Sequence, residues 1–351
     1  MNFDPASIRK ILVLRLRSIG DILLSNPSLA ALKRTFPRAV IHLLVDDLFE
    51  GLLHNNANVD KVITNPRQLS QRGIKADLAL IRQLRQEKYD LAVDLQAGTR
   101  GAFAALLSGA RHRIGHHFRF RNWLCYNMKA QAPLPDDHSW KVQFKVVTPL
   151  GAQWPQEPEF FLDFPESATR SVTKRLEEAG LMFDRPIALL HPGARVMVKR
   201  WPAEKMGALA RWLVDEREMA VIIAGSKADE EEIKSIRRAS GYALPSFADL
   251  SIWELAALIK MSNMVICNDS GPMHMAGVLD TPLVALFGPS DPVLWGPVGQ
   301  RKIVVTCEPM ECQPCDQKNC IYEGDHCTSR IELPEVQRAV ERLWELTEPQ
   351  E

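Results

Sequence analysis

The fold is decided by the stretch Asn268-Asp269-Ser270-Gly271-Pro272-Met273-His274, a short polar turn. It follows the apolar run Met264-Val265-Ile266-Cys267, which predicts a buried parallel strand. The residues from about Pro272 to Val278 predict a helix. In an open α/β sheet, ligands bind at turns that join the end of a strand to the start of a helix. The stretch therefore predicts an α/β fold with a ligand site at this turn.

The residue types in this turn suit a phosphate group. Asp269 or Ser270 can cap the helix, Gly271 lets the backbone approach a ligand closely, and Pro272 fits the first helical turn. The free N–H groups and the dipole at the start of a helix favour an anion. An ordinary capped turn without a ligand would explain the same residues, so the rest of the chain has to decide.

Composition sets the class of protein. A length of 351 residues favours two domains, and 46% hydrophobic with 25% charged residues is ordinary for a globular protein. The 43 basic and 43 acidic residues balance, so net charge gives no indication of a nucleic-acid partner. No apolar run approaches the roughly 18 residues of a membrane span. Because residues 1–10 also lack the apolar core of a signal peptide, we expect a cytoplasmic protein whose membrane contact is peripheral.

The first part of the chain is a βαβ unit, which predicts a parallel sheet. A strand is predicted at 11–14, a turn at 15–20, a helix that Asp21 opens and Thr35-Phe36-Pro37 ends, and a second strand at 40–45. Alternation then continues through the chain. The remaining strands are expected near 62–63, 91–94, 187–190, 220–224 and 282–287, and the remaining helices near 75–87, 100–108, 138–150, 167–179, 203–216, 228–238, 252–260 and 333–346.

The proline-containing stretch 151–166 predicts an interdomain linker. We expect a first Rossmann-like domain over 1–155, a second over 156–332, and a terminal helical segment, 333–351, that packs back on the first domain. Two parallel-sheet domains facing a central cleft are the architecture of GT-B glycosyltransferases and of some sugar-nucleotide epimerases.

Asp21 has two interpretations. At the carboxyl end of the first strand it would be a general base that takes a proton from a sugar hydroxyl, a role that contributes typically 10²–10⁴-fold in rate. As a structural residue it would be a helix N-cap worth about 1 kcal/mol. The turn lacks the full G-x-G-x-x-G spacing, which argues against a dinucleotide-dependent dehydrogenase.

Two further turns in the second half carry residues suited to a nucleotide. Gly193 would let a phosphate approach the backbone, and Lys199 would place an ammonium on a diphosphate, although a solvated basic loop explains both. Asp229 or Glu230 would hold a ribose diol, although the charged first turn of a helix explains both. His274 lies one turn beyond Ser270, so both can face the same side, and a structural histidine is the alternative.

These motifs together resemble the ADP-heptose:lipopolysaccharide heptosyltransferases, glycosyltransferase family 9. The matching segments span roughly residues 10 to 330 in the family's order. They are the front segment Ile11 to Asp21, His191-Pro192-Gly193, Lys199-Arg200-Trp201-Pro202, the turn 268–274, and Leu286-Phe287-Gly288-Pro289-Ser290-Asp291-Pro292. The loop between His191 and Lys199 departs from the family's pattern, which leaves the role of Lys199 less fixed than the others.

The resemblance implies a GT-B fold and a metal-independent, inverting transfer of heptose from ADP-heptose to the lipopolysaccharide inner core, with no cofactor. It implies Asp21 as the base, and Lys199, Asp269 and the Ser270-Gly271-His274 turn around the diphosphate. Asp229 or Glu230 would hold the ribose, and Leu250 would lie near adenine.

The basic segment 111–121 is interleaved with aromatic residues, and three of its arginines, Arg113, Arg119 and Arg121, are expected to bind an anionic glycolipid acceptor. A nucleic-acid patch or a solvated loop would have a similar composition. Five cysteines crowd into the chain at Cys307, Cys312, Cys315, Cys320 and Cys327. Four thiolates suit zinc or an iron–sulfur cluster, but the spacing matches no standard pattern for either.

The sequence therefore favours a glycosyltransferase at the cytoplasmic face of the inner membrane. Two alternatives stay open. The first is a sugar-nucleotide 2-epimerase of the same fold, which would need further acid and base groups around the sugar. The second is a non-enzymatic metal or redox interaction module built on residues 307–327.

Overall fold

The computed structural model describes residues 3–66, 73–96, 98–116, 124–181, 184–313, 315, 317, 320–322 and 324–347. The chain divides into two compact units, Met1–Asp163 and Phe164–Glu351. The expected boundary at 155/156 therefore lies eight residues too early, because residues 156–163 still bind the first unit: the Phe161 carbonyl accepts a hydrogen bond from Asn26, and Asp163 accepts one from Asn55. Each unit is built on its own parallel sheet.

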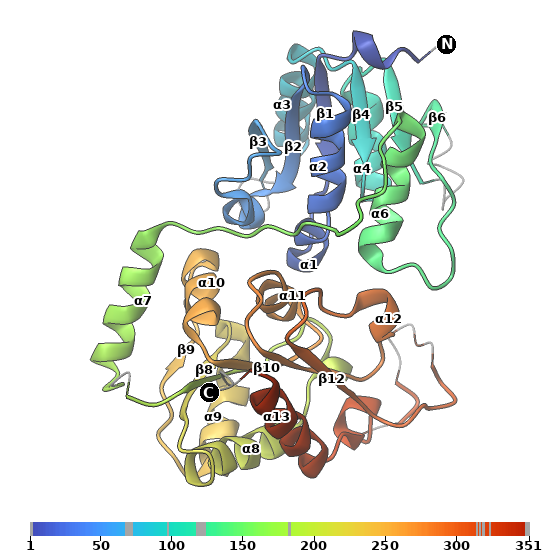
Figure 1. Ribbon diagram of the computed structural model, residues 1–351. Coiled ribbons are helices and arrows are strands. Elements are labelled where there is room, and N and C mark those ends of the chain that lie inside the picture. Colours follow the sequence, from blue (N-terminus) through green and yellow to red (C-terminus); the bar gives the residue numbers. More distant parts are fainter. Residues whose placement is uncertain are drawn as a thin grey trace. The chain divides into compact units, whose positions relative to one another are not determined.

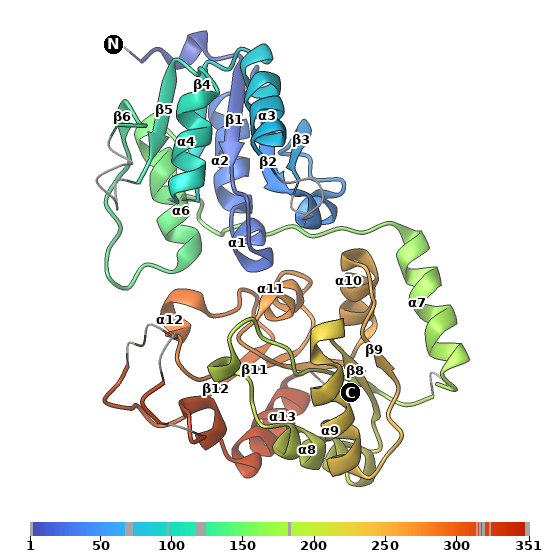
Figure 2. The same cartoon turned by 180° about the vertical axis from the view of Figure 1, so that it is seen from behind.

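The first unit has a six-stranded sheet in the order β3-β2-β1-β4-β5-β6, and every strand pair in it is parallel (Figure 1). The strands are β1 Lys10–Leu14, β2 Val40–Asp46, β3 Lys61–Asn65, β4 Leu91–Asp94, β5 His112–Gly115 and β6 Met128–Lys129. Helices α2 Asn26–Thr35 and α6 Ser139–Val147 cover one face of the sheet, and α3 Ile74–Gln86 and α4 Thr99–Leu107 cover the other (Figures 1 and 2).

The second unit repeats this topology with the order β12-β11-β10-β7-β8-β9. Its strands are β7 Ile187–His191, β8 Ala220–Ala224, β9 Ser246–Phe247, β10 Met264–Asn268, β11 Leu283–Phe287 and β12 Lys302–Thr306. Its helices are α7 Glu166–Glu178, α8 Ala203–Asp215, α9 Glu230–Ser240, α10 Ile252–Met261, α11 Gly271–Val278, α12 Pro292–Trp295 and α13 Leu333–Thr347. Read in chain order, both sheets follow the Rossmann pattern 3-2-1-4-5-6. The predicted parallel α/β class is confirmed.

The helix expected to run unbroken from Asp21 to Thr35 is two helices, α1 Ile19–Leu23 and α2. Pro27 forces the break, because it has no N–H to donate and is tolerated only in the first turn of a new helix. Ser25 Oγ and Asn26 Nδ2 donate to the Ile22 and Leu23 carbonyls at 2.6 and 2.8 Å, so the end of α1 is satisfied.

The terminal helix α13 belongs to the second unit, which corrects the expectation that it packs on the first. Val336, Ala339, Val340 and Leu343 recur at helical spacing and lie buried in the core of the second sheet. This apolar stripe packs against α8, β11 and β12. Within the described ranges, no helix has the combined length and apolar character that a membrane span needs.

Candidate functional site

The topology of the second sheet fixes the place of the site. Strand β7 is followed by β8 on one side, whereas β10 lies on its other side, so the strand order reverses between β7 and β10. In open α/β sheets, ligands bind outside the carboxyl ends of the strands at this reversal. The residues that follow β7 and β10, His191 to Lys199 and Asn268 to His274, are the ones that the sequence singled out.

An ion pair joins the two segments. Lys199 Nζ, at the end of a short 3-10 helix over Met197–Lys199, lies 2.7 Å from Asp269 Oδ2. The Asp269 side chain is 7% exposed and that of Lys199 is 17% exposed. The carboxylate is therefore largely buried under the ammonium, which still reaches solvent. A cation fixed in this way at the switch point is available to an anionic ligand.

The buried side chain of Asn268 locks the loops to the end of β10. Its Nδ2 donates to the Pro192 carbonyl at 2.6 Å, and its Oδ1 accepts from the Trp201 N–H at 3.1 Å. Sequence reasoning quoted Asn268 but gave it no role. A side-chain amide at the last position of an apolar strand is the signal that could have shown it, since such an amide offers both a donor and an acceptor to neighbouring turns.

Helix α11 begins at the same point. Ser270 occupies its N-cap position with an extended backbone, and its hydroxyl donates to the Asn268 carbonyl at 3.1 Å instead of capping the helix. Pro272 lies in the first turn as expected, and His274 is buried within the helix. The first backbone N–H groups of α11 therefore have no side-chain cap from Ser270, and the helix begins two residues after Asp269, an arrangement that suits an anion.

Gly193 is explained by a neighbour that the sequence did not reveal. A Cβ added at Gly193 would lie 2.7 Å from Asp229 Oδ2. That oxygen accepts hydrogen bonds from Ser226 N and Oγ at 2.9 and 2.6 Å, and Oδ1 lies 2.9 Å from the Arg200 guanidinium. Burial opposes ionisation of Asp229, but the Ser226 hydrogen bonds and the charge of Arg200 outweigh it and lower its pKa. Both carboxylate oxygens thus have structural partners.

Arg200 organises this loop, a role that sequence reasoning missed. It donates from Nε to the Ala194 carbonyl at 3.0 Å and pairs with Asp229 and with Glu232, the latter at 2.5 Å. Burial raises the pKa of Glu232. Since the guanidinium joins the β7 loop to α9, its contacts fix the shape of the loop that carries Lys199.

The remaining predicted donor residues occupy less constrained positions. Glu230 is exposed in the first turn of α9, directly after the buried Asp229. Leu250 is half-buried between β9 and the Ser251 cap of α10. Of the two carboxylates considered for a ribose, Glu230 is the one whose side chain faces solvent.

Asp21 lies at the equivalent reversal of strand order in the first sheet, between β1 and β4. It is the third residue of α1, and Ser18, not Asp21, is the N-cap. Asp21 Oδ2 accepts from Ser18 Oγ at 3.0 Å, and Oδ1 forms an ion pair with Arg15. Arg15 is itself anchored by donating to the Leu95 carbonyl at 2.8 Å. The carboxylate is 23% exposed, so it is held in place yet reaches solvent.

The predicted acceptor arginines divide into one that the structure describes and two that it does not. Arg113 lies on β5 and donates to the Cys125 and Ala110 carbonyls, both at 2.8 Å. These bonds give its guanidinium a structural role that ties β5 to the following segment. Arg119 and Arg121 lie outside the described residues.

The segment that contains the clustered cysteines, residues 307–327, leads into Thr328, which contacts the loop that carries Lys199. Cys307 and Cys327 are buried in the second core, and burial raises the pKa of Cys327 to about 11. Thr328 Oγ1 donates to the Val198 carbonyl at 2.7 Å, one residue before Lys199. Among the described residues, no three His, Cys, Asp or Glu side chains are grouped as metal ligands.

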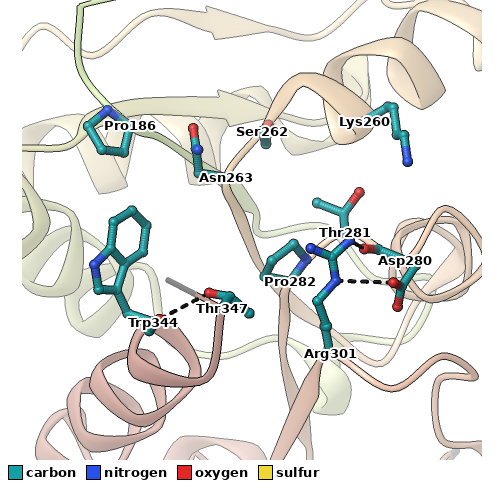
Figure 3. Close-up of a pocket in the computed structure, with 10 residues that line it drawn as sticks. All are labelled: Pro186, Lys260, Ser262, Asn263, Asp280, Thr281, Pro282, Arg301, Trp344 and Thr347. Carbon is teal, nitrogen blue, oxygen red and sulfur yellow. Dashed lines mark hydrogen bonds and ion pairs between the residues drawn. The ribbon is translucent and has the colours of Figure 1, made fainter. Parts of the chain in front are cut away.

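A cavity of about 440 Å³ lies at the opposite edge of the second sheet (Figure 3). Its basic side chains already serve the end of α11: Lys260 Nζ donates to the Leu279 carbonyl at 3.0 Å, and Arg301 pairs with Asp280. Because it opens at the amino ends of the strands, this cavity is remote from the switch point and is not the nucleotide site that we consider.

Comparison with known proteins identifies the family. The model of glycosyltransferase family 9 (heptosyltransferase) matches residues 78–326, more than half of the chain. The chain belongs to glycosyltransferase family 9. Lipopolysaccharide heptosyltransferase 3 of Escherichia coli is 27% identical over 297 residues, 82% of this chain and 86% of that protein. Lipooligosaccharide heptosyltransferase 2 of Haemophilus influenzae is 27% identical over 350 residues, 96% and 99% of the two chains.

A solved structure of a family 9 glycosyltransferase from Veillonella parvula has the same fold, with a TM-score of 0.84 and 23% identity over 98% of this chain and 99% of that one. The GT-B type of fold and the family resemblance that the sequence predicted are confirmed. Family membership makes the chain a glycosyltransferase, and the epimerase and the cysteine-based interaction module are not favoured.

Proposed function

We propose that this family 9 enzyme transfers heptose from ADP-heptose to the inner core of lipopolysaccharide, with inversion at the anomeric carbon and without a metal ion. The observation that carries the donor side is the Lys199–Asp269 pair beside the start of α11 at the β7/β10 switch point. Relatives named as lipopolysaccharide heptosyltransferases support the choice of sugar and acceptor.

In the proposed reaction, the Asp21 carboxylate accepts the proton of an acceptor hydroxyl. The oxygen attacks the anomeric carbon from the face opposite the diphosphate, and the bond from that carbon to the phosphate oxygen breaks. Negative charge grows on the leaving ADP, where the Lys199 ammonium and the N–H groups of α11 stabilise it. Asp269 keeps the ammonium in place, and Ser270, Gly271 and His274 surround the diphosphate.

The remaining groups of the donor would bind at the carboxyl ends of the strands of the second sheet. We assign the ribose to Glu230, because its side chain is exposed, whereas the Asp229 side chain is only 6% exposed and is held by Ser226 and Arg200. Leu250 would pack near adenine, and Gly193 would keep the backbone close to the phosphates. On the acceptor side, Arg119 and Arg121 would bind acidic groups of the glycolipid. A lipid-linked acceptor also implies peripheral contact with the cytoplasmic face of the inner membrane.

The test is a transfer assay with purified protein, ADP-heptose and a set of inner-core glycolipids that carry no heptose, one heptose or two heptoses. We expect the acceptor mass to rise by one heptose unit with one ADP released per transfer. UDP- and GDP-linked sugars serve as controls for the nucleotide. ADP release without an acceptor product, or transfer from UDP-sugars in preference to ADP-heptose, would contradict the proposal.

A further inference from the structure

The first unit contains an apolar cavity of about 410 Å³ between α3 and α4. These two helices lie side by side on the face of the sheet that Figure 2 turns to the viewer. Six large apolar side chains line the cavity: Leu16, Leu44, Leu80, Ile81, Phe103 and Leu107. Phe103 is 46% exposed, so this part of the apolar lining is in contact with water, whereas Leu16 and Leu44 are buried. An uncovered apolar wall of this kind suits an apolar ligand.

Polar side chains that reach solvent also line the cavity, and we call them its rim. Asn65 at the end of β3 and Thr99 at the start of α4 lie in the lining, together with Arg100 from α4 and Asp77 from α3. Leu16, two residues after β1, and Leu44, inside β2, form buried parts of the lining. The cavity thus matches an amphipathic ligand whose apolar part enters and whose polar part stays at the rim.

The lining of the cavity is connected along the chain to the segment that carries the proposed base, Asp21. Leu16 in its lining directly follows Arg15, and Arg15 forms the ion pair with Asp21. The cavity and Asp21 therefore both lie at the carboxyl ends of the strands of the first sheet, where α/β folds bind ligands. A ligand that presents a hydroxyl to Asp21 could extend its apolar part towards Leu16.

We propose that the α3–α4 cavity binds an acyl chain of the glycolipid acceptor. This inference rests on the proposed function, since it takes the acceptor of that reaction as the occupant. The acyl chain covers Phe103, Leu80 and Leu107, and the polar part of the lipid meets Thr99 and Arg100 at the rim.

The experiment compares two acceptors that differ only in their acyl chains. One carries chains short enough to stay monomeric in water, and the other is fully deacylated. We expect kcat/KM of the wild-type enzyme to be at least about tenfold higher for the acylated acceptor, the effect of burying about two methylene groups. Equal kcat/KM values for the two acceptors would overturn the acyl-chain site and leave heptosyl transfer intact. Transfer to neither would contradict the proposed function as well.

A matched pair of variants locates the effect. Ala104→Trp fills the cavity, because Ala104 lies in its lining, whereas Ala79→Trp adds the same ring to an exposed position of α3 outside the lining. Ala104→Trp should remove the preference for the acylated acceptor and leave kcat/KM for the deacylated one within about twofold of wild type. Ala79→Trp should keep the preference. If both variants behave alike, the cavity is not the site.

A second variant guards against misfolding of Ala104→Trp. Phe103→Ser changes a half-exposed side chain, so the fold should be retained, and the preference for the acylated acceptor should fall at least about threefold. Binding to vesicles of anionic phospholipid is measured in parallel. Loss of vesicle binding in Phe103→Ser with an unchanged acceptor preference would make the cavity a general membrane contact and refute the proposal.

Discussion

Replacing Lys199 by alanine tests the proposed diphosphate site. The ammonium lies 2.7 Å from Asp269, and the Lys199 side chain is 17% exposed, so a bound anion would meet a charge that is partly shielded from water. A hydrogen bond to a charged group contributes about 1.5–3 kcal/mol, which corresponds to about 10- to 150-fold in Kd. AMP has no second phosphate to meet this cation. We therefore expect Lys199→Ala to weaken ADP binding by about 10- to 150-fold and AMP binding by less than about threefold.

Calorimetric titration of both nucleotides measures the two losses in the same preparation. Lys199→Ala also leaves the buried Asp269 carboxylate without its ion-pair partner, which lowers stability and repels a diphosphate. The double variant Lys199→Ala/Asp269→Asn removes that carboxylate charge, so it should recover Tm and part of the ADP affinity. Equal losses for ADP and AMP in the double variant, once its Tm is restored, would refute the assignment of Lys199 to the diphosphate.

Three further outcomes follow from the same site. Gly193→Ala should lower Tm and ADP affinity, because its Cβ would lie 2.7 Å from Asp229 Oδ2. Gly225→Ala should be tolerated better, because the nearest neighbour of its Cβ would be Ile233 Cδ1 at 3.2 Å. Equal effects of the two substitutions in thermal-shift assays would contradict this. The lowered pKa of Asp229 means that its contribution to stability is complete above the unfolded pKa of about 3.9 and is lost as pH falls towards the lower folded value. Denaturant titrations should therefore show a shallower acid limb in Asp229→Asn, and an unchanged limb would count against a depressed pKa. Transfer should survive brief exposure to EDTA, since Lys199 and α11 supply the positive field; a loss of activity at once, with the fold intact and rescue by magnesium or manganese, would disprove metal independence.

Hydrophobic patterning predicted the central strands of both sheets well. β4 and β8 have the predicted bounds, and β1, β2, β7 and β10 differ from the predicted bounds by one residue at an end. These strands are buried on both faces, so their sequences are continuous apolar runs that are easily recognised. The edge strands β6 and β9 are two residues long and carry no such run.

β5 and β12 were missed for different reasons. His112 and Arg113 belong to the basic segment that was interpreted as an acceptor-binding site, yet the backbone of β5 pairs with that of β4 and the Arg113 guanidinium donates to two carbonyls. β12 has the Val- and Ile-rich composition of a strand, but it directly precedes the cysteine segment. Because that region was interpreted in terms of metal ligands, the strand was not predicted.

The candidate site was predictable where function depends on chain order and not where it depends on contacts. Turns after β7 and β10 meet because parallel strands end at one edge of the sheet, whereas the ion pair between Lys199 and Asp269 is a contact that the sequence did not predict. The engagement of Asp229 by Ser226 and Arg200 depends on how the loops fold over each other, which no local pattern encodes. The same holds for the hydrogen bonds of Asn268.

The most direct test of the central claim is the turnover of Asp21→Asn in heptosyl transfer. Asparagine keeps the size of the side chain and can still accept from Ser18, but it cannot take the acceptor proton. The account predicts a fall in kcat of at least about 10²-fold with donor Kd close to wild type, and a Tm that falls because the buried Arg15 loses the charge of its ion-pair partner. Near-normal turnover would show that Asp21 only pairs with Arg15 and Ser18 to shape the start of α1, and would contradict its role as the base.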